Sequence, residues 1–260
     1  MKTSFYLHPH LKKYFKETES LFSQLMALHG IRFREQKGRL TQRIVLGEKS
    51  YFIKQHRGVG FKEIIKNLLQ GKIPIVSAKN EWLAIHKLKS LNIATPHISG
   101  YGERGVNPAS KQSFVLMEEI TDVISLEDFC KDWHKKPPSF TLKYHLIKET
   151  ARIAAILHKN GINHRDFYIC HFLLNPHTLT LYLIDLHRAQ IRRKTPKRWI
   201  IKDLAGLYFS SIEIGLTRHD VFRFIKFYHK TTLRDIVTVE KRFWEQVKKR
   251  GEQLYRDNLR

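Results

Sequence analysis

Two aspartates that flank a predicted pair of short strands constrain this chain more than any other feature. The first, Asp166, completes the triplet His164-Arg165-Asp166, and an apolar strand begins beside His171, five residues later. A turn follows, and a second apolar strand over 181–184 ends in Asp185. Strands joined by a short turn pair side by side, so this order brings two carboxylates to neighbouring strand ends.

Carboxylates in this arrangement are typical of phosphoryl transfer, which needs position and charge more than covalent chemistry from the protein. Asp166 is predicted to orient an attacking hydroxyl group, and Asp185 to hold Mg²⁺. Upstream, Lys54 ends a predicted strand, and Glu81 lies on a later predicted helix, where it could pair with the lysine. Each residue alone has a commoner explanation, as a surface lysine, a surface glutamate or a turn aspartate. Their order along the chain favours a kinase.

His171 and Asp203 each leave two alternatives open. His171 stands where kinases usually carry asparagine, so it either ligates a metal or hydrogen-bonds the loop. Asp203 begins a predicted helix, and it either caps that helix or binds the backbone of the catalytic loop. A zinc site is not favoured, because the histidines and Cys170 lack a metal-binding spacing.

The charge balance points to an anionic partner. The 260 residues hold 47 Lys and Arg against 24 Asp and Glu, a formal net charge of +23. Part of this charge follows Asp185 directly, where a kinase places the segment that meets the acceptor; the run comprises Arg188, Arg192, Arg193, Lys194, Lys197 and Arg198. The run predicts an anionic acceptor, and the plainer alternatives are a solvated face or attraction to an anionic membrane. No nucleic-acid motif accompanies the charge, so nucleic acid is not an expected partner.

Two further features bear on location. Only two cysteines are present, Cys130 and Cys170, which fits a reducing compartment rather than a disulfide framework. No apolar run approaches the ~18–20 residues of a membrane-spanning helix, and no secretory signal is evident at the start. The sequence predicts a cytoplasmic protein, soluble or peripheral, and leaves its protein partners unknown.

Hydrophobic periodicity predicts an α+β chain of two lobes. The N-terminal lobe, 1–120, would bind nucleotide and would begin with a helical extension over 1–29; the C-terminal lobe, 121–260, would carry catalysis and the acceptor site. Strands are expected at 31–34, 40–46, 50–54, 97–101 and 113–117, with turns at Lys37-Gly38 and Gly47-Glu48, and helices at 11–29, 61–69 (closed by Gly71 and Pro74), 78–91, 142–159, 203–214, 218–229 and 239–255.

Several segments closely resemble one family, the lipopolysaccharide core heptose(I) kinases (the WaaP/RfaP family). The resemblance spans roughly residues 30–235 and is dense in 49–58, 62–69, 125–128, 161–174, 184–190, 203–211 and 215–217. It implies a bilobal protein-kinase-like fold, with an antiparallel sheet and helices in the first lobe and a largely helical second lobe. It also implies ATP- and Mg²⁺-dependent phosphorylation of the first heptose of the lipopolysaccharide inner core, at its 4-hydroxyl, on the cytoplasmic face of the inner membrane of a Gram-negative bacterium. The implied partners are the inner-core and lipid A glycolipid and the anionic membrane surface.

The predicted site therefore has four parts. Asp166 is catalytic, and Asp185 with His171 forms the metal site. Lys54, Glu81, Met117 and Glu118 bind the nucleotide, and the acceptor-binding set comprises Arg165, Arg188, Arg192, Arg193, Lys197 and Arg198. Two departures from protein kinases stand out, the lack of a glycine-rich loop before Lys54 and Asp-Leu-His in place of Asp-Phe-Gly. The alternatives are a kinase for the second heptose or Kdo, or a non-catalytic kinase-like module that binds anionic glycolipid.

Overall fold

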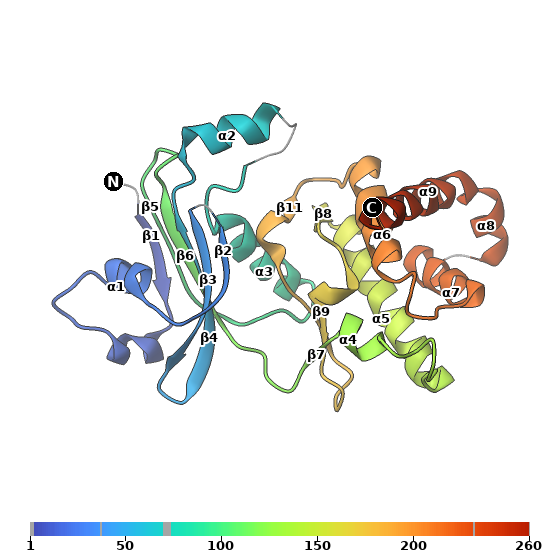
Figure 1. Cartoon of the computed structure of the whole chain (residues 1–260), viewed down its shortest axis with the longest axis horizontal. Coiled ribbons are helices and arrows are strands. Elements are labelled where there is room, and N and C mark those ends of the chain that lie inside the picture. Colours follow the sequence, from blue (N-terminus) through green and yellow to red (C-terminus); the bar gives the residue numbers. More distant parts are fainter. Residues whose placement is uncertain (1–2, 37, 70–73, 231, 260) are drawn as a thin grey trace. The chain divides into compact units, whose positions relative to one another are not determined.

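The computed structural model describes residues 3–36, 38–69, 74–230 and 232–259 and divides into two compact units (Figure 1). The first unit comprises residues 1–87 and 96–121, and the second comprises 88–95 and 122–260. The division after Thr121 lies next to the predicted lobe boundary. Residues 88–95 belong to the second unit, where the backbone carbonyl of Ala94 accepts the N–H of Leu183 at 2.9 Å.

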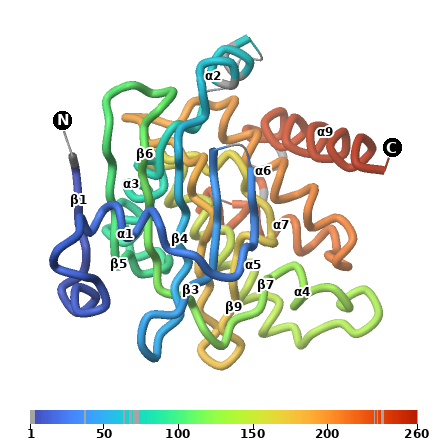
Figure 2. Tube along the Cα trace, turned by 60° about the vertical axis from the view of Figure 1, so that its left-hand side comes forward, coloured from blue at the N-terminus to red at the C-terminus, as the bar shows by residue number. Residues whose placement is uncertain are grey.

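The first unit is built on a six-stranded antiparallel sheet in the order β1-β5-β6-β4-β3-β2, and Figure 2 shows β1 at one edge of it. The predicted meander over 31–54 is present, and its second turn contains Gly47 at φ 65°. Two residues named in the predictions, Lys37 and Gly71, lie outside the described residues. The strands are β1 Thr3–Leu7, β2 Ile31–Gln36, β3 Arg39–Leu46, β4 Lys49–Arg57, β5 Ile98–Arg104 and β6 Gln112–Glu118, and the helices are α1 Leu21–Ala27, α2 Gly60–Leu69 and α3 Lys79–Ser90.

The continuous helix expected over 11–29 is wrong. The chain begins instead with β1, whose Tyr6 pairs with Tyr101 of β5, and continues through a 3₁₀ helix, Pro9–Tyr14, before the short α1. The apolar spacing reflects burial rather than one helix. Leu11 and Leu25 are fully buried in the same core cluster as strand residues of β4 and β6, so tertiary packing decides the local structure here.

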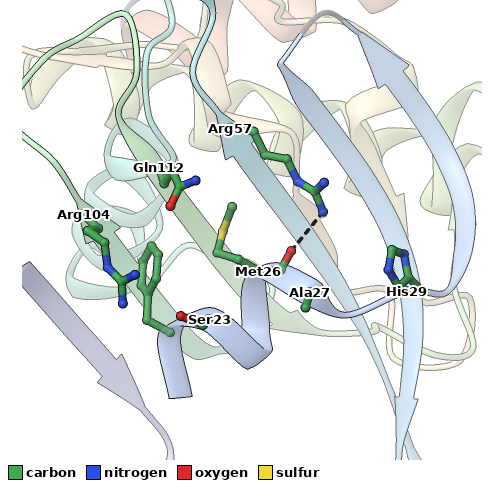
Figure 3. Close-up of a pocket in the computed structure, with 8 residues that line it drawn as sticks. Ser23, Met26, Ala27, His29, Arg57, Arg104 and Gln112 are labelled. Atoms are coloured by element: carbon green, nitrogen blue, oxygen red, sulfur yellow. Dashed lines mark hydrogen bonds between the residues drawn. The ribbon is translucent and has the colours of Figure 1, made fainter. Parts of the chain in front are cut away.

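Polar groups fasten α1 to the sheet. Arg57 on β4 donates to the carbonyl of Met26 at 3.0 Å, as Figure 3 shows. Gln55, also on β4, donates to the carbonyl of Leu25 at 2.8 Å, although its side chain is fully buried. Because side chains alternate along a strand, Lys54 lies on the opposite face from Gln55. A surface pocket of about 390 Å³ remains beside α1, and it contains no residue of the predicted site.

The second unit is mostly helical, and its short strands form a three-stranded and a two-stranded antiparallel sheet. The helix predicted from 203 begins six residues earlier, after Pro196, so the end of the basic run lies in its first turn. The elements are α4 Leu126–Cys130, α5 Phe140–Lys159, α6 Lys197–Ser210, α7 Arg218–His229, α8 Leu233–Thr238 and α9 Lys241–Asn258, with strands β7 Ile124–Ser125, β8 Ile162–Asn163, β9 Phe172–Leu174, β10 Leu181–Leu183 and β11 Gln190–Ile191.

A large pocket lies among the helices of this second unit. Its volume is about 830 Å³, and α5, α6, α7 and α9 all contribute to its wall. The lining is mainly apolar and includes Trp133, Leu146, Leu207, Phe224, Ile225 and Trp244. Within the described ranges, every helix of the protein is too short or too polar to cross a lipid bilayer.

Candidate active site

The predicted catalytic loop is anchored where α5 ends. Gly161 has φ 76°, and a side chain there would collide with the backbone carbonyl of Arg192. Its own carbonyl accepts the N–H of Arg192 at 2.9 Å, and Asn163 pairs with Gln190 between β8 and β11. Glycine is required by this close approach and left-handed backbone. The loop after β8 and the segment after Asp185 are therefore fastened together.

The carboxylate of Asp203 binds the backbone of the same loop. Its Oδ2 accepts the N–H of His164 at 2.7 Å, and its Oδ1 accepts the N–H of Arg165 at 2.8 Å. The carboxylate is buried in the middle of α6, which begins at Lys197, so it does not cap the helix. Of the two alternatives for Asp203, the structure has the bond to the loop backbone. It also holds Arg165 at φ 76°, an unfavourable conformation that surrounding bonds must maintain.

His164 links the two predicted catalytic segments. Its ring is fully buried, and Nε2 lies 3.0 Å from the carbonyl oxygen of Ile184, the residue before Asp185. Because that carbonyl only accepts, Nε2 carries the proton and donates it. Burial lowers the pKa of His164, so the ring stays neutral near pH 7. The hydrogen bond of the buried histidine therefore connects the loop to the strand end.

Asp166 forms an ion pair with Arg188. The Arg188 guanidinium donates to Asp166 Oδ1 at 2.6 Å, and the two side chains are 29% and 15% exposed. A charge-assisted bond of this length in a partly shielded place orients the carboxylate firmly. Arg188, predicted to bind the acceptor, thus contacts the predicted catalytic group directly.

Asp185 lies between two histidines. It adopts φ 58°, and its Oδ1 is 2.7 Å from His187 Nδ1, while its Oδ2 is 3.6 Å from His171 Nε2. His171 Nδ1 lies 2.6 Å from the carbonyl oxygen of Asp166, so Nδ1 donates there. Nε2 is then the ring nitrogen that faces Asp185. The loop hydrogen bond is present, and the other nitrogen keeps the capacity to ligate a metal.

The side chains around Asp185 suit a cation that takes few of its ligands from the protein. No cluster of three or more His, Cys, Asp and Glu side chains that could hold a metal ion occurs in the described part of the chain. Mg²⁺ usually takes only one or two carboxylates from the protein and completes its shell with water and substrate phosphates. Asp185 fits that pattern, and His171 is the adjacent candidate.

The predicted nucleotide-binding residues all belong to the first unit. Lys54 Nζ donates to Glu81 Oε1 at 2.7 Å, and the Glu81 side chain is only 2% exposed. The sequence suggested this pair, because a lysine at the end of a strand is followed by a glutamate on a later helix. The ion pair joins β4 to the first turn of α3. Met117 is buried at the end of β6, where the N–H of Glu118 donates to the carbonyl of His97 at 2.9 Å.

The predicted acceptor residues divide by burial. Arg165 is only 6% exposed, and Arg192 is half-buried and donates to the side chains of Asn163 and Gln190. Arg193, Lys197 and Arg198 are exposed, as is Lys194. Arg165 and the half-buried Arg192 thus pack within the protein, while the exposed side chains remain available to a ligand.

Two residues beside this set were missed by sequence reasoning. Trp199 has the charged groups of Arg165, Arg198 and Lys202 at 5.3 Å from its ring centroid, within cation–π range. Burial and then the charges of nearby arginines, Arg165 first, lower the pKa of the Lys202 ammonium. The signal was available, since Lys202 follows Arg198 by one helical turn, but it depends on where α6 begins.

A sheet unit with a lysine–glutamate pair and a helical unit with a His-Arg-Asp loop and a following strand-end aspartate define a phosphotransferase of the protein-kinase-like class. Residues 23–228 match the lipopolysaccharide kinase (Kdo/WaaP) family, and the chain belongs to that family. Curated relatives include the lipopolysaccharide core heptose(I) kinase WaaP of Escherichia coli K12, 46% identical over 239 residues, and that of Pseudomonas aeruginosa PAO1, 45% identical over 240 residues; each match covers 90% of both chains.

A solved structure described as WaaP in complex with acyl carrier protein is also similar. Its TM-score is 0.83 at 39% sequence identity, and the match covers 97% of this chain and 99% of that chain. The predicted α+β, protein-kinase-like fold class is therefore confirmed, as is the predicted family.

Proposed function

We propose that the protein is an ATP-dependent kinase that phosphorylates the first heptose of the lipopolysaccharide inner core, at its 4-hydroxyl, during core biosynthesis. The observation that carries this proposal is an intact His164-Arg165-Asp166 loop with Asp185, in a chain 45–46% identical to named heptose(I) kinases. The close identity favours the first heptose over the second heptose or Kdo, and the complete set of charged groups favours an enzyme over a binding module.

Each part of the site then has a role in phosphoryl transfer. Lys54 holds the ATP phosphates, Glu81 positions the lysine, and Met117 with Glu118 lies at the nucleotide base. Asp185, with His171 beside it, holds Mg²⁺, which when bound neutralises phosphate charge. Asp166 accepts a hydrogen bond from the heptose hydroxyl and aims its oxygen at the terminal phosphorus.

The acceptor is an anionic glycolipid, and its recognition is assigned to the positive cluster beside Asp166. Arg165 and Arg188 lie against the catalytic aspartate, and the exposed Arg193, Lys197 and Arg198 extend the positive field outward. Arg192 and Lys202 complete the cluster around Trp199. Phosphates and acidic sugars of an inner core and lipid A carry the complementary charge. We place the enzyme peripherally at the cytoplasmic face of the inner membrane, where such a glycolipid is assembled.

The decisive test combines a deletion strain with purified enzyme. Mass spectrometry of lipopolysaccharide core from the deletion strain should show one phosphate missing from the first heptose, restored by the wild-type gene. Purified enzyme with ATP and the dephosphorylated core should return that phosphate to the same sugar. A phosphate missing from the second heptose or from Kdo would reassign the acceptor, and an unchanged core would refute the proposal.

The metal assignment makes a separate prediction. Asp185→Ala should lower activity and raise the Mg²⁺ concentration for half-maximal rate about tenfold or more, because it removes the carboxylate ligand. His171→Ala should raise it less if Nε2 ligates the ion. Asp257→Ala, an exposed carboxylate elsewhere, is the matched control. The measurement is initial rate against free Mg²⁺, and an Asp185→Ala enzyme with unchanged metal dependence would contradict the assignment.

We further propose that the protein associates with an acyl carrier protein, as its solved structural neighbour does. The apolar pocket of about 830 Å³ in the second unit supports this, since an acyl chain needs an apolar enclosure. Narrowing the pocket with Val221→Trp should weaken binding of acyl-loaded carrier at least several-fold by steric exclusion, with little effect on carrier lacking the chain. Val106→Trp, at a 78% exposed position, is the control. Calorimetric titration that shows equal affinity for both carrier forms would remove the pocket from the interaction.

A further inference from the structure

Helix α2 presents large apolar side chains to solvent. Phe61 is 60% exposed, Ile65 is 54% exposed and Leu69 is 84% exposed. These residues recur at every fourth position and so form one apolar stripe along the helix predicted at 61–69. Figures 1 and 2 both show α2 standing clear of the sheet of the first unit, directly after β4. The stripe is therefore an outward face of this unit.

The helix is amphipathic with lysines at the border of its apolar face. An α-helix turns by about 100° per residue, so Phe61, Ile65 and Leu69 fall within about 80° of one another. Lys62 and Lys66 follow next around the helix, at about 100° and 140° from Phe61. The two lysines and the apolar pair Ile65 and Leu69 together line a surface depression of about 440 Å³. Apolar and basic groups thus share one exposed surface.

We propose that α2 docks on an anionic lipid bilayer, with Phe61, Ile65 and Leu69 inserted into the headgroup–acyl boundary and Lys62 and Lys66 against lipid phosphates. A helix that buries one apolar face in a bilayer needs this pattern, because long lysine side chains reach back to the headgroups while their stems stay apolar. A net charge of +23 is complementary to an anionic surface and draws the whole molecule to it.

The occupant of this surface follows from its composition. A protein partner that covered three exposed apolar side chains would leave the bordering lysines to be matched by carboxylates at fixed positions. An anionic bilayer offers lipid phosphates to the lysines at every position along the helix. The inference rests on the proposed function in one respect, since a kinase whose acceptor is a membrane glycolipid must work at a bilayer surface.

The test is co-sedimentation with vesicles of phosphatidylglycerol and phosphatidylcholine, without acceptor or nucleotide. The wild-type protein should bind, and the triple variant Phe61→Ser/Ile65→Ser/Leu69→Ser should lose about tenfold or more in partition coefficient. The matched control Val106→Ser/Val239→Ser/Leu259→Ser removes apolar groups that are 78%, 75% and 67% exposed elsewhere, and it should bind as wild type. Equal binding by the triple variant, or an equal loss in the control, overturns the proposal.

Reversing the lysines separates charge from insertion. Lys62→Glu/Lys66→Glu should weaken binding about tenfold or more to anionic vesicles but little to phosphatidylcholine alone, and added salt should shrink the difference. The control Lys89→Glu/Lys249→Glu makes the same net charge change at exposed positions elsewhere and should lose clearly less. Light scattering completes the set: a wild-type dimer that the triple serine variant converts to monomer would assign α2 to self-association and overturn membrane docking.

Failure of this inference and failure of the proposed kinase activity give different results. With acceptor dissolved in detergent, the triple serine variant should phosphorylate it with wild-type kcat and KM. If the wild-type protein phosphorylates acceptor but does not bind vesicles, only the proposal that α2 docks on a bilayer fails. If it binds vesicles through α2 but does not phosphorylate acceptor, only the proposed kinase activity fails.

Discussion

Asp166→Ala should reduce kcat by about 10²–10⁴-fold, because the variant loses the group that orients and accepts the proton of the attacking hydroxyl. The thermal midpoint should change little, since the carboxylate lies in a partly shielded place at the surface, where its ion pair is with Arg188. The measurement is steady-state phosphorylation of glycolipid acceptor, with ATP affinity measured in parallel and expected to stay near that of wild type.

Asp166→Asn is the informative companion. It keeps the size of the side chain and one oxygen, yet removes the charge that Arg188 pairs with. Its activity should lie near that of the alanine variant, because an amide does not accept the proton. Near-normal kcat from either folded variant would remove Asp166 from the mechanism.

Asp203→Ala should impair both stability and activity. It removes the acceptor for the N–H groups of His164 and Arg165, which are buried, and each stranded donor costs about 1–3 kcal/mol. A total of several kcal/mol is a large share of the ~5–15 kcal/mol that stabilises a typical domain. The thermal midpoint should therefore fall by several degrees or more. Activity at low temperature should also fall, because the loop loses the carboxylate that binds its backbone.

The two effects can be separated by temperature and by the asparagine variant. Asp203→Asn keeps one oxygen for one N–H group and turns an amide toward the other, so its thermal midpoint should lie between those of alanine and wild type. Asp220→Ala, at another buried aspartate that caps α7, should lower stability without a specific loss of kcat in the remaining folded protein. A stable, fully active Asp203→Ala enzyme would show that the loop does not depend on this carboxylate.

Local patterns predicted the parts of the fold that local forces decide. The meander over 31–54 was predicted because alternating apolar residues and a glycine turn specify hairpins within a few residues. The link between Asp203 and the catalytic loop was one of two stated alternatives, since the residue type admits both. The roles of Lys54, Asp166 and Asp185 remain predictions, and the Asp166→Ala and Asp185→Ala variants test two of them.

Long-range packing decided the parts that the sequence did not predict. A strand over 3–7 forms because the edge of β5 is there to pair with, and nothing in those few residues specifies it alone. The pairing of Arg188 with Asp166 joins residues 22 positions apart, so no local pattern reports it. The apolar stripe of α2 has the same periodicity whether it faces a core or solvent, which is why periodicity alone could not predict its exposure.

The predicted catalytic loop is held in large part through its main chain. The N–H groups of His164 and Arg165 bind Asp203, the carbonyl of Asp166 binds His171, and the carbonyl of Gly161 binds the N–H of Arg192. Every residue type except proline supplies the same backbone groups. These bonds therefore persist when a side chain that takes no part in them, such as that of Arg165, is replaced. A loop held in this way can change such side chains while the backbone that carries Asp166 keeps its position.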